Sequence, residues 1–134
     1  DVQRQALEST EKLLTETGCP QNYTLILDSH ENASKYIKKN FCAGVFNLGW
    51  LPGSDKTVTT KRESTRKAID TAVRLIDKDG ILLIAVYPGH EEGRLEGEMI
   101  TNMLSRISRF ELSVSRFQII NSPSSPYFFI AERK

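Results

Sequence analysis

Positions 81–87, Ile-Leu-Leu-Ile-Ala-Val-Tyr, form a continuous apolar run that constrains the fold more than any other feature of this chain. A run that is apolar throughout, without alternating polar residues, is typical of a strand covered on both faces, as in a parallel sheet. The run is also far shorter than the ~20 apolar residues of a membrane-spanning helix. We therefore expect a buried central strand and no membrane partner.

Helix and strand patterns alternate along the chain as far as residue 108. Apolar residues recur at helical spacing in 3–17, 31–39, 64–77 and 91–108. Short apolar runs predict strands at 23–27, 43–46 and 81–87. This alternation predicts an α/β fold with a parallel sheet, right-handed crossovers and helices on both faces.

The end of the chain departs from this alternation. Residues 112–120 and 127–131 are both predicted strands, and only the segment Asn-Ser-Pro-Ser-Ser-Pro separates them. No helix fits in so short a connection, so the two strands are expected to be antiparallel. The sheet should therefore end in a hairpin.

The charge balance excludes a strongly cationic nucleic-acid binder. The 134 residues carry 18 Lys+Arg and 17 Asp+Glu, and 39% of them are hydrophobic, which suits one globular domain over 1–134. Locally, 53–67 holds five positive and two negative residues, and Arg106, Arg109 and Arg116 form a second basic group near the hairpin. Such residues either contact RNA phosphates or form a solvated face.

The two cysteines favour a reduced, cytoplasmic protein. Cys19 and Cys42 have neither the spacing of zinc ligands nor the density of a disulfide scaffold. No signal-peptide pattern opens the sequence.

Polar side chains that could converge on a ligand follow the predicted strands. In an open parallel sheet, ligands bind at the carboxyl ends of the strands, near the point where the strand order reverses. The loops at such ends are 28–30, 47–53 and 88–90, and residues 1–3 would join them if a strand preceded them.

Asp1 and His30 each allow two interpretations. A carboxylate just past a strand can accept two hydrogen bonds from a ribose diol, but Asp1 is equally explained as a plain N-terminal charge. His30 could contact an adenine or a carboxylate, or it could be a solvated loop residue.

The loop that begins at Asn47 is the most informative segment. The Asn47 amide offers a donor and an acceptor in one plane, and beside the aromatic Trp50 it could hold a planar base or an amine. Gly49 and Gly53 permit close approach of the backbone to a ligand. An ordinary turn with a buried Trp50 is the alternative.

Several common catalytic motifs do not occur in the sequence. It contains no GxSxG, HExxH, CxxC, Walker or GxGxxG pattern, and its two histidines are too few for a histidine-rich metal site. We therefore expect no metal site.

Taken in order, these segments resemble class I S-adenosylmethionine-dependent methyltransferases of a family labelled rRNA methylases. The resemblance rests on an acid with Gln at 1–3, Ser-His-Glu at 29–31, Asn-Leu-Gly-Trp-Leu-Pro-Gly-Ser-Asp-Lys at 47–56, Thr-Thr at 59–60 and Tyr-Pro-Gly-His-Glu-Glu-Gly at 87–93. Members of this family are assigned to methylation of 5-aminomethyl-2-thiouridine, the tRNA wobble base, on its exocyclic amine. The resemblance implies a Rossmann-like sheet that ends in an antiparallel hairpin.

The resemblance also implies a role for each matching residue. S-adenosylmethionine would be bound by Asp1, Gln3, Ser29, His30, Asn47, Leu48 and Gly49. The nucleoside pocket would be formed by Trp50, Leu51, Pro52, Lys56 and Tyr87. Asn47 would orient the amine, and Asp55 or His90 would accept or relay its proton. The implied partner is tRNA, through its anticodon stem-loop, and a homodimer is left open.

Two departures accompany the resemblance. Trp50 stands where members often carry Tyr, and Pro88 stands where they carry His, so that His90 is the titrating group of its loop. The strand, glycine-rich cofactor loop and first helix that open the family's domain do not match any of these residues, so we expect an N-terminally incomplete domain.

Three other functions remain open at this point. The chain could be an inactive module that binds RNA or a partner. It could be part of a nicotinamide-dependent dehydrogenase, although the terminal hairpin and the Asn47 loop argue against this. It could also be a methyltransferase that acts on rRNA or on a small molecule.

Overall fold

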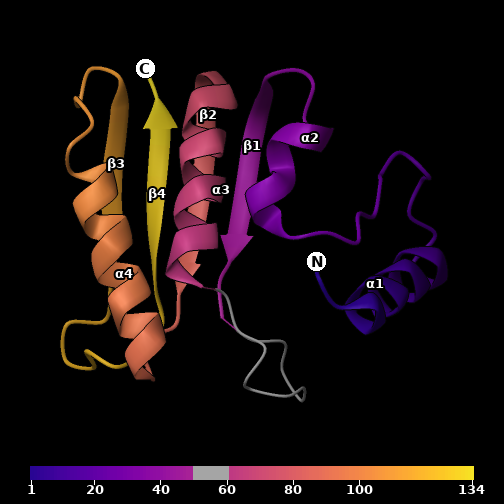
Figure 1. The fold of residues 1–134 in the computed structure, drawn as a ribbon, viewed down its shortest axis with the longest axis horizontal. Coiled ribbons are helices and arrows are strands. Elements are labelled where there is room, and N and C mark those ends of the chain that lie inside the picture. The colour runs from indigo at the N-terminus through magenta and orange to yellow at the C-terminus, as the bar shows by residue number, and fades with distance from the viewer. Residues whose placement is uncertain (50–60) are drawn as a thin grey trace.

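The computed structural model describes residues 1–49 and 61–134. The described elements, in chain order, are α1 (Arg4–Glu16), the 3-10 helix η1 (His30–Asn32), α2 (Ala33–Tyr36), β1 (Phe41–Asn47), α3 (Arg62–Leu75), β2 (Ile76–Val86), α4 (Glu91–Leu104), β3 (Leu112–Phe117) and β4 (Tyr127–Arg133) (Figure 1). Helices are confirmed in the four predicted regions, although 31–39 holds only the end of η1 and the four-residue α2, and the predicted strands from residue 43 onward are confirmed.

The strands form one sheet in the order β1-β2-β4-β3. β1 and β2 are parallel, whereas β4 lies antiparallel between β2 and β3. The expected terminal hairpin is therefore present, and its second strand is inserted next to β2. This arrangement places the carboxyl ends of β1 and β2 side by side.

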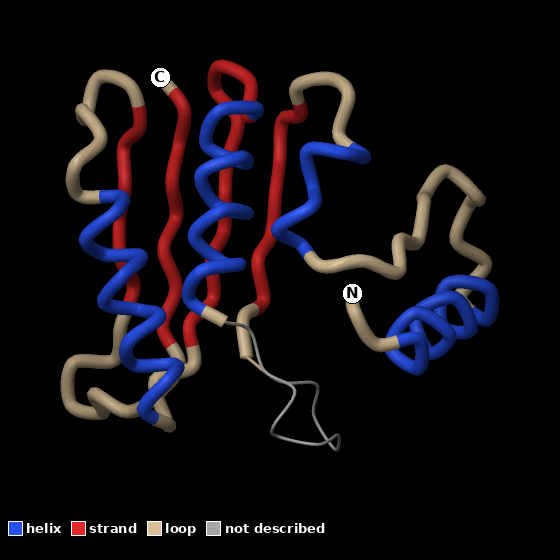
Figure 2. The backbone as a smooth tube through the Cα atoms, in the orientation of Figure 1, coloured by secondary structure: helices blue, strands red, loops and turns tan. Residues whose placement is uncertain are grey.

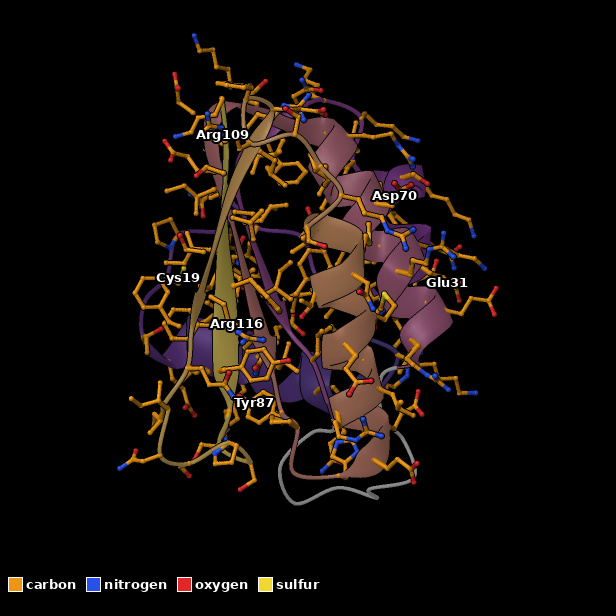
Figure 3. The ribbon with its side chains drawn as sticks, turned by 90° about the vertical axis from the view of Figure 1, so that its left-hand side faces the viewer. Cys19, Glu31, Asp70, Tyr87, Arg109 and Arg116 are labelled. Atoms are coloured by element: carbon orange, nitrogen blue, oxygen red, sulfur yellow. The ribbon has the colours of Figure 1, made fainter. Side chains whose placement is uncertain are left out.

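α3 and α4 cover one face of the sheet (Figures 1 and 3). Alternate residues of β2, among them Leu82, Ile84 and Val86, are fully buried on that face, together with Ile69 of α3 and Ile100 of α4. Burying one such side chain contributes about 1.5–3 kcal/mol, so this layer is the main source of stability for the described fold.

The opposite face of the sheet is more exposed than the sequence predicted. Val45 is 72% exposed, Phe117 is 53% exposed and Ile81, the first residue of the apolar run, is 47% exposed. The expectation that both faces of 81–87 are covered was wrong for the described residues, because α3 and α4 pack on the same side. α1 lies beyond the free edge of β1 (Figure 1).

The segment 23–27, predicted as a strand, is extended but belongs to no sheet (Figure 2). Its backbone bonds run to the first residue: the Asp1 amino group donates to the Ile26 carbonyl at 3.0 Å, and the Asp28 N–H donates to the Asp1 carbonyl at 3.1 Å. An apolar segment forms a β-strand only when a neighbouring strand pairs with it. Among the described residues, only Asp1 pairs with this segment through its backbone.

None of the described helices combines the length and the apolar character that crossing a membrane requires.

Two glycines near the start of α4 provide a test of how closely this helix approaches the strand end. A Cβ on Gly93 would lie 2.1 Å from the Tyr87 carbonyl oxygen, whereas a Cβ on Gly89 would meet nothing within 4 Å. Ala is favoured over Gly in a helix by about 1 kcal/mol, but a clash with backbone costs about 1–3 kcal/mol. We expect Gly93→Ala to lower the free energy of unfolding and Gly89→Ala to leave it almost unchanged, as measured by urea denaturation. Equal stability of the two variants would contradict this packing.

Candidate functional site

The candidate site lies where β1 and β2 end. Asn47 is the last residue of β1 and pairs in register with Ala85 of β2. The parallel ladder continues for one further bond, from the Leu48 N–H to the Ala85 carbonyl at 3.3 Å. Leu48 is only 4% exposed and joins the core. The turn that begins at Asn47 is therefore anchored to both the sheet and the core.

Tyr87, the first residue after β2, holds this turn from the side. Its hydroxyl donates a hydrogen bond to Asn47 Oδ1 at 2.9 Å. Its ring lies against Gly49, where an added Cβ would be 3.7 Å from Tyr87 Cδ2. Gly49 has φ +118°, a conformation that L side chains rarely adopt. The predicted residues Asn47, Leu48, Gly49 and Tyr87 are thus brought together.

His90 lies at the start of α4, close to the same strand ends. Its Nδ1 accepts a hydrogen bond from the Gly93 N–H at 3.1 Å, which caps the helix. A neutral imidazole has one acceptor nitrogen, so this contact assigns the proton to Nε2. The lone pair that would accept a substrate proton is therefore engaged by the cap.

A buried polar pair that was not predicted from the sequence joins the beginning of α3 to the second turn of α4. Thr65 is fully buried, Glu96 is 3% exposed, and the Thr65 hydroxyl donates to Glu96 Oε1 at 2.5 Å. An ion pair between Arg62 and Glu92 at 3.0 Å lies alongside. The sequence did contain a signal, because Glu96 stands four residues before the apolar Ile100 and so shares its helix face.

The predicted cofactor residues near the N-terminus form a second group. Asp1 Oδ1 accepts a hydrogen bond from the Gln3 N–H at 2.8 Å, and the Asp1 side chain is exposed. The main chain of Asp1 is bonded to Ile26 and Asp28, so its position is tied to the loop that holds Ser29 and His30. In Figure 1 the N-terminus lies beyond the edge of β1, at the level where β1 ends.

Asp28, which was not among the predicted site residues, organises this second group. Its carboxylate accepts hydrogen bonds from the Tyr36 hydroxyl at 2.6 Å, the Asn32 amide at 2.8 Å and the Ser29 N–H at 2.7 Å. These bonds, with that of Tyr36 the strongest influence, lower the pKa of Asp28 from 3.8 to about 2. Asp28 therefore fixes the loop and stays ionised.

His30 is partly buried within this loop. Burial lowers the pKa of His30 below its ordinary value. Its Nε2 is buried and has no hydrogen-bond partner in the part of the chain that the structure describes. Ser29 Oγ accepts a weak bond from the Glu31 N–H at 3.4 Å and so caps η1. A buried nitrogen without a partner is what a heterocyclic ligand such as adenine could satisfy.

The remaining predicted site residues cannot be placed in these groups. Trp50, Leu51, Pro52, Asp55 and Lys56 lie outside the described residues. No hydrogen bond or ion pair among the described residues joins the Asn47 group to the Asp1 group directly.

The basic residues near the hairpin are divided between the two ends of the sheet. Figure 3 places Arg109 at the end opposite to Tyr87, and Arg116 toward the Tyr87 end. The Arg116 guanidinium lies 5.6 Å from the centre of the Tyr127 ring. Arg116 pairs in register with Phe129, which pairs with Ile84, so the Arg116 side chain lies on the helix-covered face of the sheet and not on the face of Asn47.

Potential metal ligands do not cluster: the described residues contain no group of three or more His, Cys, Asp or Glu side chains that could hold an ion.

A family model described as "Putative rRNA methylase" matches residues 1–133 of this chain. Among curated proteins, the chain is 31% identical over 134 residues to the chloroplastic tRNA (mnm(5)s(2)U34)-methyltransferase of Arabidopsis thaliana. That alignment covers 94% of this chain and 48% of the relative, so the chain spans about half the length of the curated relative.

Solved structures agree with this similarity. A "putative rRNA-methylase" from Clostridium thermocellum has a TM-score of 0.95 at 32% identity, and a "putative methyltransferase" from Streptococcus mutans in complex with SAH has a TM-score of 0.91 at 31% identity. Each match covers 100% of this chain and 73% of the other. The Rossmann-like methyltransferase fold that the sequence predicted is thereby confirmed.

The depressed pKa of Asp28 predicts a specific pH dependence. Because the folded-state pKa is about 2 and the ordinary value is 3.8, the ionised Asp28 stabilises the fold above about pH 4, and this contribution is lost as the pH falls toward 2. We expect wild type to be more stable than Asp28→Asn at pH 7, with the difference shrinking between about pH 4 and 2. Urea denaturation at several pH values measures it, and a difference that does not vary with pH would contradict the assignment.

Proposed function

The chain belongs to the rRNA methylase family whose model matches residues 1–133, and we propose from this membership that the complete protein transfers a methyl group from S-adenosylmethionine to a nitrogen nucleophile. We further propose that this nucleophile is the exocyclic amine of a modified wobble uridine in tRNA. The first step is supported by the structure from Streptococcus mutans, which contains SAH, the form that S-adenosylmethionine takes after losing its methyl group. The second is supported by the name of the Arabidopsis thaliana relative.

The observation that carries the proposal is the fixed turn at the end of β1. Asn47 and Leu48 extend the parallel pair by one bond, and the ring and hydroxyl of Tyr87 hold Asn47 and Gly49 in place. Ligands of open parallel sheets bind at this edge. A turn fixed by several contacts suits a reaction in which positioning supplies most of the rate.

For this reaction the protein must position the amine next to the sulfonium methyl group and keep the amine unprotonated. The sulfonium methyl of S-adenosylmethionine is already electrophilic when the cofactor is bound. An aliphatic amine is mostly protonated at pH 7, so it must lose a proton before its lone pair can attack. In the proposal, Asn47 Oδ1 accepts an N–H of the neutral amine and so directs its lone pair.

In the proposal, Asp55 accepts the proton that the amine loses. The sequence offered Asp55 and His90 for this role, and the cap contact from Gly93 already engages the acceptor nitrogen of His90. This contact favours Asp55.

The Asp1 group supplies the proposed cofactor contacts. The exposed Asp1 carboxylate would accept bonds from the ribose hydroxyls, and the buried His30 Nε2 would meet the adenine. The Gln3 N–H donates to the Asp1 carboxylate, and the Ser29 side chain caps η1, which begins at His30. The Asp28 N–H donates to the Asp1 carbonyl and the Asp28 carboxylate accepts from the Ser29 N–H, so Asp28 links Asp1 to the loop of Ser29 and His30.

Ribosomal RNA is the alternative substrate, because the family description and a structure from Streptococcus thermophilus at 27% identity carry the name rRNA methylase. Basic residues such as Lys61, Arg66 and Arg116 suit the backbone of either RNA. A substrate panel therefore has to separate the two.

Replacement of Asn47 tests the proposed reaction. In the product of the complete gene, we expect Asn47→Ala to lower methyl transfer to tRNA that carries 5-aminomethyl-2-thiouridine on the order of 10²-fold, because the amine is no longer oriented. Calorimetry should show that S-adenosylmethionine still binds. Asn102→Ala, at an exposed position of α4, is the matched control and should retain activity.

Near-native turnover of Asn47→Ala would contradict the role of Asn47. Transfer to rRNA fragments but not to tRNA, measured with a radiolabelled methyl group in the wild-type protein, would overturn the tRNA assignment and favour the alternative.

A further inference from the structure

We propose that Tyr87 is a positioning residue for Asn47 and acts on the reaction through the Asn47 amide. The family resemblance implies only that Tyr87 lines the nucleoside pocket. This inference rests on the proposed function and deepens it, because it says how the acceptor for the amine is held.

The position of Tyr87 follows from the parallel register. Asn47 is opposite Ala85, and Tyr87 stands two residues further along β2's direction, so its side chain leaves the sheet on the same face as Asn47. Its hydroxyl reaches Asn47 Oδ1 at 2.9 Å, a normal length for a hydrogen bond. The contact spans 40 residues of sequence and depends on the pairing of the two strands.

The hydrogen bond fixes the position of the Asn47 amide oxygen. A side-chain amide that is turned by 180° exchanges its oxygen for its NH₂ group, and the two ends differ in what they can bind. In the structure Oδ1 faces the Tyr87 hydroxyl, and Nδ2 is turned away from it. An amide oxygen has two lone pairs, so Oδ1 can accept from Tyr87 and from a substrate amine at once.

The ring of Tyr87 is itself held, so its hydroxyl cannot follow a turning amide freely. Tyr87 Cδ2 and Cγ lie 3.7 Å and 4.0 Å from the place of a Cβ on Gly49, which puts the ring against the backbone of the same turn. The carbonyl of Tyr87 is packed against Gly93 of α4. The strand and the helix therefore hold the backbone of Tyr87, and the turn at Gly49 supports one side of its ring.

This role predicts an effect on turnover that is separate from substrate binding. Removing one hydrogen bond that fixes a reacting group should lower kcat about tenfold in Tyr87→Phe, while KM for tRNA stays nearly constant. A residue that lined the nucleoside pocket would chiefly raise KM.

The experiment uses the product of the complete gene with its tRNA substrate and compares Tyr87→Phe with Tyr23→Phe. Tyr23 is a tyrosine whose hydroxyl has no hydrogen bond among the described residues, and it should behave as wild type. Both changes are then repeated with Asn47→Ala under single-turnover conditions. We expect the loss caused by Tyr87→Phe to vanish there, because the group that it positions is gone.

A second readout does not depend on activity. The side-chain amide signals of Asn47, identified by their disappearance in Asn47→Asp, should shift in Tyr87→Phe and stay in place in Tyr23→Phe in a ¹H–¹⁵N NMR spectrum.

The possible failures are distinguishable. If the wild-type protein methylates no RNA, the proposed function fails, and the NMR comparison still decides whether Tyr87 holds Asn47. If the wild type is active but Tyr87→Phe keeps full kcat, raises KM alone, or loses as much in the Asn47→Ala background as outside it, the inference is overturned.

Discussion

The parallel register of β1 and β2, which sets Asn47 opposite Ala85, determines the geometry of the candidate site. Adjacent parallel strands end at the same edge of a sheet, so the residues that follow β1 and β2 lie side by side there. The backbone pairing extends one residue beyond β1, because the Leu48 N–H donates to the Ala85 carbonyl. The Tyr87 hydroxyl adds a side-chain hydrogen bond to Asn47. A shift of this register by one residue would place Asn47 on the other face of the sheet and separate the two side chains.

The helices hold this edge in place from one side. α4 begins at the strand end, where Gly93 leaves room for the Tyr87 carbonyl and for the cap from His90. The buried pair of Thr65 and Glu96 joins the second turn of α4 to the beginning of α3. A buried carboxylate would be costly without such a partner, so the pair also specifies how the two helices lie against each other.

Much of this architecture could be predicted because it depends on local periodicity. The helical stripe of α3 and the continuous run of β2 are set by neighbouring residues, and the short connection before β4 dictates an antiparallel hairpin. The run 23–27 had the same apolar pattern, but its pairing is limited to the first residue of the chain. The hydrogen bond between Tyr87 and Asn47 joins residues 40 positions apart, and the bond between Thr65 and Glu96 joins residues 31 positions apart. The helical spacing from Glu96 to Ile100 indicates that Glu96 is buried, but no spacing rule identifies the partner in either bond.

The central claim is that a methyl donor and an amine meet at the turn of Asn47, Leu48 and Gly49. Chemical-shift mapping of the complete gene product with S-adenosylhomocysteine tests it most directly. The account predicts the largest backbone amide changes at residues 47–49 and 28–30, with further changes at Tyr87. Changes confined to the far end of the sheet, around residues 105–111, with residues 47–49 unaffected, would contradict it.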